Sequence, residues 1–392
     1  MNPPTSHRAR EIEAFEVMDV LSRAHALEAA GRRVVHMEIG EPDFSAPEPV
    51  VEAGVRALRE GRTAYTATLG LPALREAIAG FYATRFHTKI AASRIAITSG
   101  ASGGLLTVAA LYVNPGDEIL VPDPGYPGYR HFVRAFEGVA KPLAVSAADD
   151  FQPTAAMIEK AWTKGTRCVL LGSPSNPTGT VIDPAQLKEI ALFVEKRGGV
   201  LIVDEIYQGL TYGAEPLRSP FTALGLPGHV VVINSFSKYF CMTGWRLGWV
   251  VLPEAPVRDF EKLAQHLFIS APSAAQHAAL AAFLPESLAI LESRRKEFAL
   301  RRDQFVPELK KAGLAIPAEP RGAFYVYADC GADAKRFALE LLEKEAVAAT
   351  PGVDFGANGT TRCVRFAYTR GLAELEEAAA RVTRFAASWL SA

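Results

Sequence analysis

A series of short, almost wholly apolar runs constrains the fold of this chain more than any other feature. The runs are separated by segments of helix length, and they are IAI (95–97), EILV (118–121), CVLL (168–171), VLIV (200–203), VVVI (230–233) and LGWVV (247–251). Strands that are apolar on both faces are typical of parallel sheets covered by helices. The stretch DPAQLKEIALFVEKRGG (183–199) has the acid, basic and glycine positions of an amphipathic helix. Alternating strands and helices predict an α/β layered domain with right-handed crossovers.

The last third of the chain has a different pattern. ESRRKEFALRRDQFVPELKKAG (292–313) predicts one long, charged helix that ends at Gly313. Strand candidates at 322–329 and 362–368 then alternate with helix candidates, which is an α+β pattern. A chain of 392 residues is long enough for two or three lobes. We predict a large α/β domain and a small α+β domain, with these boundaries: 48–290 for the large domain, and 1–47 with 291–392 for the small one.

Composition excludes several function classes. A net charge of -1 gives no electrostatic reason to bind nucleic acid or an anionic membrane surface. The N-terminal stretch MNPPTSHRAREIEAF lacks the apolar core of a secretion signal, and no apolar run approaches the length of a membrane span. The four cysteines form no CxxC pair, which argues against a disulfide framework or a structural zinc site. We therefore expect a cytoplasmic protein without a metal. We interpret the cysteines as structural, together with six histidines: His36, His87, His131, His229, His266 and His277.

Polar and glycine-rich segments follow five of the apolar runs. In chain order they are TSGASGG, PDPGYPG, GSPSNPTG, DEIYQG and NSFSK. Ligands bind at the carboxyl ends of the strands in an open parallel sheet, so these segments should meet at one site. The site would contain a lysine, an acid, a nest of serine and glycine residues and an arginine.

These groups match the parts of one cofactor. The turn SGASGGLL (99–106) leads into a helix and offers backbone N–H groups and a positive dipole end to a phosphate. Ser235, Ser237 and Arg246 add hydroxyl donors and a permanent positive charge. A carboxylate across the site can keep a pyridine nitrogen protonated. Lys238 follows a core strand, so its pKa should be lowered and its amine can hold an aldehyde as an imine. Phosphate, pyridinium and aldehyde together describe pyridoxal 5'-phosphate.

The same segments carry a family resemblance. SFSKYFCMTGWRLGW (235–249), preceded by SPSNPTG (173–179) and VDEIY (203–207), closely resembles the class I/II aminotransferases of fold-type I, the aspartate-aminotransferase-like pyridoxal-phosphate enzymes. The resemblance extends from IGEPDF (39–44) to RCVRFAY (362–368). It implies a mostly parallel seven-stranded sheet covered by helices, with a smaller α+β domain. It also implies ping-pong transfer of an amino group between an L-amino acid and a 2-oxo acid.

The resemblance implies roles around the cofactor ring. Lys238 would form the internal aldimine and later move the proton between the substrate Cα and the cofactor. Asp204 would hold the protonated ring nitrogen. Tyr207 and Asn176 would hydrogen-bond the phenolic oxygen of the ring, and Tyr126 would stack on the ring.

The resemblance also implies phosphate and subunit contacts. The residues that would hold the phosphate are Ala101 (through its backbone), Ser102, Ser235, Ser237 and Arg246. Tyr65, in AYTATLGLPALR (64–75), matches a tyrosine that reaches the phosphate of the neighbouring subunit. The loop 269–273 would likewise complete the pocket of its neighbour. The implied assembly is a homodimer with shared active sites.

The resemblance also implies contacts with the substrate. Arg365 would clamp the α-carboxylate of the amino acid or oxo acid, together with Asn176 and the backbone of Gly40. Family members specific for dicarboxylates often use an additional arginine from the partner subunit. The corresponding stretch HLFISAPSAAQHAAL (266–280) contains none, which favours neutral donors such as alanine, branched-chain or aromatic amino acids over aspartate. Three other cations near the N-terminus stay open as alternatives: Arg8, Arg10 and Arg23.

Other interpretations stay open at this stage. Taken alone, NPTG (176–179) could be a turn, Asp204 a helix N-cap, and Arg365 the partner of a structural acid. A pyridoxal-phosphate-dependent lyase, of the C–S β-lyase or aminocyclopropane-carboxylate-synthase type, would share the fold and much of the site. A regulator that borrowed the fold would need a DNA-binding extension, which the segment before GEPDF (40–44) is too short to supply.

Overall fold

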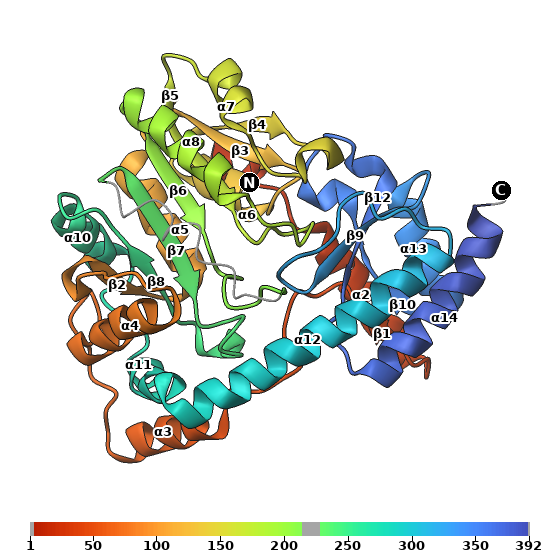
Figure 1. The fold of residues 1–392 in the computed structure, drawn as a ribbon, viewed down its shortest axis with the longest axis horizontal. Helices are drawn as coiled ribbons and strands as arrows, with labels where there is room; N and C mark the ends of the chain where they lie inside the picture. Colours follow the sequence, from red (N-terminus) through yellow and green to blue (C-terminus); the bar gives the residue numbers. More distant parts are fainter. Residues whose placement is uncertain (1–3, 214–227, 391–392) are drawn as a thin grey trace.

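The computed structural model describes residues 4–213 and 228–390, and its centre is a sheet of seven strands (Figure 1). In spatial order the strands are β2 (Ile95–Thr98), β8 (Gly248–Val251), β7 (Val230–Ser235), β6 (Val200–Asp204), β5 (Thr166–Gly172), β3 (Glu118–Asp123) and β4 (Val139–Ala144). All six apolar runs are strands of this sheet. The predicted fold class, a seven-stranded α/β sheet covered by helices, is confirmed.

Strand direction brings the carboxyl ends of six strands, β2 to β7, to one edge of the sheet. β3, β4, β5, β6 and β7 run parallel, whereas β8 is antiparallel to both of its neighbours, β2 and β7. One strand of opposite direction among seven agrees with the expectation of a mostly parallel sheet. The connection from Ser235 to Gly248 contains no crossover helix, so the chain returns antiparallel. As a result β8 begins at the same edge at which β2, β3, β5, β6 and β7 end.

Both faces of the sheet are buried, as the apolar runs predict. Along β7, Val230 and Val232 pack into one apolar cluster, whereas Val231 and Ile233 pack into the other. Such a strand can only sit between two layers. The helices around this sheet are α3 (Glu48–Arg59), α4 (Pro72–Arg85), α5 (Gly100–Tyr112), α6 (Gly128–Ala135), α7 (Ala155–Ala161), α8 (Pro184–Lys196), α10 (Val257–Leu267) and α11 (Ser273–Leu280). The predicted helix α8 starts at Asp183, whose carboxylate accepts from two backbone amides, with Pro184 in the first turn.

A second lobe is built from the C-terminal third. The long helix α12 (Pro285–Lys311) begins earlier than predicted, with Pro285 in its first turn, and ends before Gly313, whose φ is +91°. A small sheet has the order β11 (Thr350–Pro351), β12 (Cys363–Ala367), β9 (Tyr325–Asp329), and all of its pairs are antiparallel. Two helices complete this lobe: α13 (Ala334–Glu345) and α14 (Leu372–Trp389).

Residues 16–36 of the N-terminal segment pack on this second lobe. β1 (Val35–His36) pairs in parallel with β10 (Val347–Ala348), and Figure 1 shows α2 (Glu16–Ala29) beside the C-terminal helices. Leu27 of α2 shares an apolar cluster with Leu342 of α13. A short helix, α1 (His7–Glu11), precedes α2. The domain boundaries themselves stay a prediction, and α12 passes through the one expected at 290.

Three further findings concern only residues 4–213 and 228–390. No single helix there is long and apolar enough to span a membrane, and the one helix pair that passes the same test together bends by 82°. No group of three or more His, Cys, Asp or Glu side chains there is placed to hold a metal ion. All four cysteines are buried and free.

Candidate active site

A cavity of about 270 Å³ lies at the edge where the parallel strands end. Segments from both lobes line it. Of the predicted site residues, the following line this cavity: Gly40, Ala101, Ser102, Tyr126, Asn176, Asp204, Tyr207, Ser235, Ser237, Lys238, Arg246 and Arg365. Tyr65 does not line it, and its side chain is 79% exposed.

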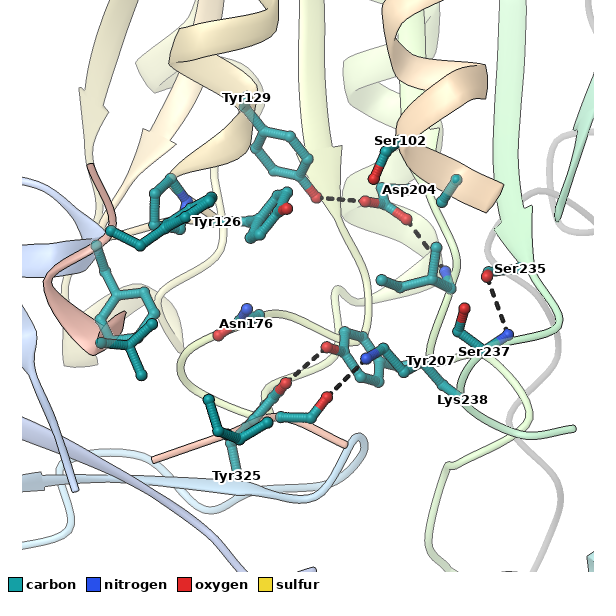
Figure 2. Close-up of a pocket in the computed structure, with 18 of the residues that line it drawn as sticks. Ser102, Tyr126, Tyr129, Asn176, Asp204, Tyr207, Ser235, Ser237, Lys238 and Tyr325 are labelled. Atoms are coloured by element: carbon teal, nitrogen blue, oxygen red, sulfur yellow. Dashed lines mark hydrogen bonds between the residues drawn. The ribbon is translucent and has the colours of Figure 1, made fainter. Parts of the chain in front are cut away.

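Lys238 enters this cavity directly after β7 (Figure 2). Its Nζ donates to the carbonyl oxygen of Gly40 at 2.6 Å and lies 5.9 Å from the ring centres of Tyr207 and Phe324. Burial lowers the pKa of the Lys238 ammonium to about 8, and the carboxylate of Glu41 opposes this shift. A lysine with such a pKa has a substantial neutral fraction near neutral pH, so it can act as a nucleophile and as a base.

Asp204 is the last residue of β6 and faces the same cavity. The hydroxyl of Tyr129 donates to its Oδ2 at 2.8 Å, and the backbone N–H of Ile206 donates to its Oδ1 at 3.1 Å. Burial raises the pKa of Asp204 to about 6, although both hydrogen bonds act against that shift. Residues 205–209 form a turn rather than a helix, so the interpretation as an N-cap is wrong. The carboxylate is positioned to accept a hydrogen bond from a donor in the cavity.

An anion cradle lines the same cavity where α5 begins. Gly100 has φ +72°, and a Cβ there would lie 2.5 Å from Nη2 of Arg246, so only glycine fits. Ser235 and Ser237 are buried beside it, and the N–H of Ser237 donates to Oγ of Ser235 at 3.0 Å. Arg246 stands directly before β8, which its antiparallel direction brings to this edge. A helix start with two hydroxyls and a guanidinium is suited to a phosphate.

Arg365 reaches the cavity from β12 of the second lobe. Its Nη1 donates to Oδ1 of Asn176 at 2.9 Å, and its Nη2 donates to Oγ1 of Thr350 at 3.1 Å and to the carbonyl of Glu38. Its Nε is buried without a hydrogen-bond partner. These partners are neutral acceptors, so the interpretation as half of a structural ion pair is wrong. A buried guanidinium with an unpaired N–H is suited to a carboxylate ligand.

Aromatic residues form the remaining walls. The hydroxyls of Tyr207 and Tyr325 are 2.7 Å apart, and burial raises the pKa of Tyr207 well above its ordinary value. The ring of Tyr126 meets that of Tyr129 edge-on, at 5.3 Å. Gly40 passes so close to Tyr325 that a Cβ would lie 1.8 Å from its hydroxyl oxygen. Figure 2 shows the labelled tyrosines, Asn176 and Lys238 around one open space.

Several lining residues have no counterpart in the sequence prediction. Tyr129 had an available signal, because it lies in the first turn of α6, three residues after Tyr126 of the preceding turn. The others reach the cavity from distant segments and left no local signal: Phe15, Val17, Glu38, Tyr325, Asp354 and Phe355. The three alternative cations Arg8, Arg10 and Arg23 do not line the cavity; they contact Glu137, His7 and Glu343, respectively.

The lining residues fit pyridoxal phosphate. The cradle at Gly100 accommodates a phosphate, the buried Asp204 can pair with a protonated ring nitrogen, and the partly neutral Lys238 can bind an aldehyde. These three groups lie around one cavity, as the parts of this cofactor require.

Comparisons with known proteins agree with this fit. A family model described as "Aminotransferase class I and II" matches residues 32–382. The (5-formylfuran-3-yl)methyl phosphate transaminase of Methanocaldococcus jannaschii is 39% identical over 97% of this chain and 99% of its own length. The valine–pyruvate aminotransferase of Mycobacterium tuberculosis is 36% identical, with 97% of each chain covered. The crystal structure of Thermus thermophilus aspartate aminotransferase with maleate is 31% identical and superimposes with a TM-score of 0.91, covering 98% of this chain and all of the other.

The family match spans most of the chain, and the relatives are matched over nearly their whole lengths. The fold, the cavity and these matches lead to one conclusion. This chain belongs to the aminotransferase class I and II family, and it is a pyridoxal-phosphate-dependent aminotransferase.

Proposed function

We propose that this enzyme transfers an amino group from a neutral L-amino acid to a 2-oxo acid in a ping-pong reaction. When bound, pyridoxal phosphate supplies an aldehyde for the amino group and a ring that draws electrons from the substrate Cα. Lys238 would hold the cofactor through its aldehyde and would act as the base that moves the proton at the substrate Cα. Asp204 keeps the ring nitrogen protonated. Tyr207 and Asn176 hydrogen-bond the ring oxygen, and Tyr126 covers the ring face.

The substrate and phosphate contacts complete the proposal. The phosphate is held by Ala101, Ser102, Ser235, Ser237 and Arg246, and the substrate α-carboxylate by Arg365, Asn176 and the backbone of Gly40. The observation that carries the proposal is that a half-buried lysine, a buried carboxylate, an anion cradle and a guanidinium with an unpaired N–H line one cavity.

A single half-reaction tests this function. Enzyme loaded with pyridoxal phosphate and mixed with a donor amino acid, without acceptor, should end with the cofactor as pyridoxamine phosphate and one equivalent of oxo acid. A lyase of the same fold would instead return pyridoxal phosphate. Absorbance spectra and extraction of the cofactor separate the two outcomes, and recovery of unchanged pyridoxal phosphate with every amino acid would contradict the proposal.

Charge in the cavity supports a neutral donor. The only cations among the described lining residues are Lys238, Arg246 and Arg365, and the proposal assigns all three to the cofactor or the α-carboxylate. Among these described lining residues a distal carboxylate would find no further cation, and it would face Asp354, which is 4% exposed. The relative named as a valine–pyruvate aminotransferase supports the same preference. A screen of amino acids with pyruvate and 2-oxoglutarate as acceptors tests it; a preference for aspartate would contradict it.

Replacing Arg365 by lysine should weaken the binding of amino acids and of oxo acids to a similar extent. Lysine offers a compact charge where a planar fork is needed to grip a carboxylate through two parallel hydrogen bonds. We expect KM for both substrate classes to rise by about tenfold or more, the loss of one or two charge-assisted hydrogen bonds. Steady-state kinetics measures this. A loss confined to one substrate class would place Arg365 at the side-chain pocket instead.

We also propose a homodimer with shared active sites, in which Tyr65 and the loop 269–273 serve the neighbouring subunit. Ser102 and Arg246 of the cradle are exposed, as are Tyr65 and Ile269, and cover by a second copy would complete the site. A two-fold interface makes such contacts reciprocal. The free, buried cysteines agree with our expectation of a cytoplasmic location.

A hybrid dimer tests the crossed supply. One subunit carries Lys238→Ala and the other carries Tyr65→Phe. If each tyrosine serves its neighbour, the intact lysine is paired with an intact Tyr65, and the hybrid should show about half of the wild-type activity with normal cofactor affinity. If each tyrosine serves its own site, the remaining lysine site keeps the Tyr65 defect, and the proposal fails. Activity in a monomer that equals that of the wild type would also contradict it.

A further inference from the structure

The N-terminal residues 8–16, here called the N-terminal strap, lie along α6 and end at the cavity. Three ion pairs and one ring contact join the strap to this helix and its end: Arg8 to Glu137 at 3.5 Å, Glu11 to Arg134, Glu13 to Arg130 at 3.9 Å, and Phe15 to Tyr126 with ring centres 6.5 Å apart and planes inclined by 23°. The partner numbers fall as the strap numbers rise. The strap therefore runs antiparallel to α6, toward the active site.

The spacing of the partners explains this path. Tyr126, Arg130 and Arg134 are four residues apart, so they form one stripe along α6 and the turn before it. The charges on the strap are complementary to the stripe, with Glu11 and Glu13 opposite the two arginines. Each exposed ion pair is weak by itself and is screened by salt. Together the three ion pairs fix the position of the strap along the helix.

A buried carboxylate fixes the end of the strap. The backbone N–H of Glu16, the first residue of α2, donates to Oδ1 of Asp354 at 3.0 Å. Phe15, at the N-cap position, makes no side-chain capping hydrogen bond, so Asp354 supplies the acceptor for this orphan amide from far along the chain. Arg130 connects the two anchors, because its Nη2 also donates to the carbonyl of Asp354 at 3.2 Å.

The anchored end forms a wall of the cavity. Phe15 and Val17 line it together with Tyr126, Ile39 and Phe355, which add apolar surface beside the capping carboxylate of Asp354. Phe15 is 37% exposed, which means that its position depends on the strap rather than on a surrounding core. A donor side chain that is larger than a methyl group and apolar would gain contact area against this wall.

We propose that the N-terminal strap, through its ion pairs with α6 and the Asp354 cap, positions Phe15 and Val17 and thereby determines how well large apolar donors bind relative to small ones. Arg130, Arg134 and Asp354 are positioning residues in this view, and Phe15 is the residue that contacts the donor side chain. The inference rests on the proposed transfer from neutral amino acids and adds the residues that select among them.

A charge exchange tests the ion pairs. Glu11→Arg and Arg134→Glu should each lower kcat/KM for leucine by about two- to five-fold, the effect of one exposed ion pair, mainly through KM. The value for alanine, which does not reach the wall, should stay unchanged. The double variant restores an opposite-charge pair and should recover the leucine value. Lys311→Glu, which breaks an exposed pair with Glu308 at the end of α12, is the matched control and should change neither value.

The cap is tested in the same assay. Asp354→Ala should lower kcat/KM for leucine by about five-fold, the factor that corresponds to the free energy of one helix cap. Asp354→Asn keeps an acceptor for the backbone N–H of Glu16, so this variant should retain most of the wild-type kcat/KM. Phe15→Ala should lower kcat/KM for leucine more than it lowers kcat/KM for alanine. Cofactor retention should match the wild type in all these variants, and the melting temperature should fall by no more than about 2–4 °C, which excludes unfolding as the cause.

The outcomes separate the two levels of the proposal. If the wild type yields no pyridoxamine phosphate with any amino acid, the proposed function fails. If the wild type is active but the strap variants change leucine and alanine equally, or change neither, the selection role is overturned. A double variant as impaired as the singles would overturn the pairing of Glu11 with Arg134. A leucine KM that rises with salt in the wild type, but less in Arg134→Glu, would support the strap independently.

Discussion

Replacing Lys238 by alanine should lower the rate of the half-reaction by about 10²–10⁴-fold or more, because the methyl side chain can neither bind the cofactor aldehyde nor move a proton. The variant should still bind pyridoxal phosphate, since the cradle at Gly100 and the carboxylate of Asp204 do not depend on the lysine. Stopped-flow absorbance with a saturating donor measures the rate, and Lys262→Ala, which removes an exposed lysine of α10, is a suitable control. A variant that transaminates at the wild-type rate would show that another group binds the aldehyde and moves the proton.

The low pKa of Lys238 gives the same residue a pH signature. Burial favours the neutral amine, so the fraction of nucleophilic lysine in the cofactor-free enzyme increases as the pH rises through about 8. The rate at which this enzyme takes up pyridoxal phosphate should therefore increase over that range and level off above it. A rate that increased only near the ordinary pKa of lysine would mean that the buried environment does not shift this group.

Replacing Asp204 by asparagine should lower kcat by about 10²–10³-fold, the usual cost of removing one oriented electrostatic group from an active site. The amide cannot keep the ring nitrogen protonated, so the electron demand at the substrate Cα is lost. The fold should survive, because the amide oxygen can still accept a hydrogen bond from Tyr129 or from the N–H of Ile206. Half-reaction rates and melting temperatures measure the two effects.

Tyr129→Phe is the matched control for this variant. It removes one of the donors that oppose the rise in the pKa of Asp204, but it leaves the carboxylate in place. The carboxylate should become more basic and the loss of activity should be much smaller than with asparagine. An asparagine variant within a few-fold of the wild type would contradict the pairing of Asp204 with the ring nitrogen.

The fold could be predicted from the sequence wherever the residues of a single strand show how that strand is buried. Strands buried on both faces, such as β7, read as continuous apolar runs and reveal their layer without any partner. The edge strand β4, with the sequence VAKPLA, is half exposed and has no such run. The two-residue strands β1, β10 and β11 are too short for any periodicity to appear. Their pairing is decided by tertiary packing.

The site was predictable for a related reason. Because parallel strands end at one edge, the polar residues after each run were expected to meet, and they do. Arg365 and Gly40, in contrast, enter from the second lobe, and only the family resemblance located them. Phe15 and Asp354 depend on how the N-terminal strap crosses α6, and no local pattern in either segment indicates that contact.

The pairing of β1 with β10 has a consequence for how the chain is made. The two strands lie near opposite ends of the sequence, so at about 5–20 residues per second β10 leaves the ribosome roughly 15–60 s after β1. During that interval Ala24, Leu27 and Val34 have not yet met Leu342, their later neighbour, although the seven-stranded sheet can already assemble. The nascent chain thus carries an apolar N-terminal segment without its later partner through most of translation.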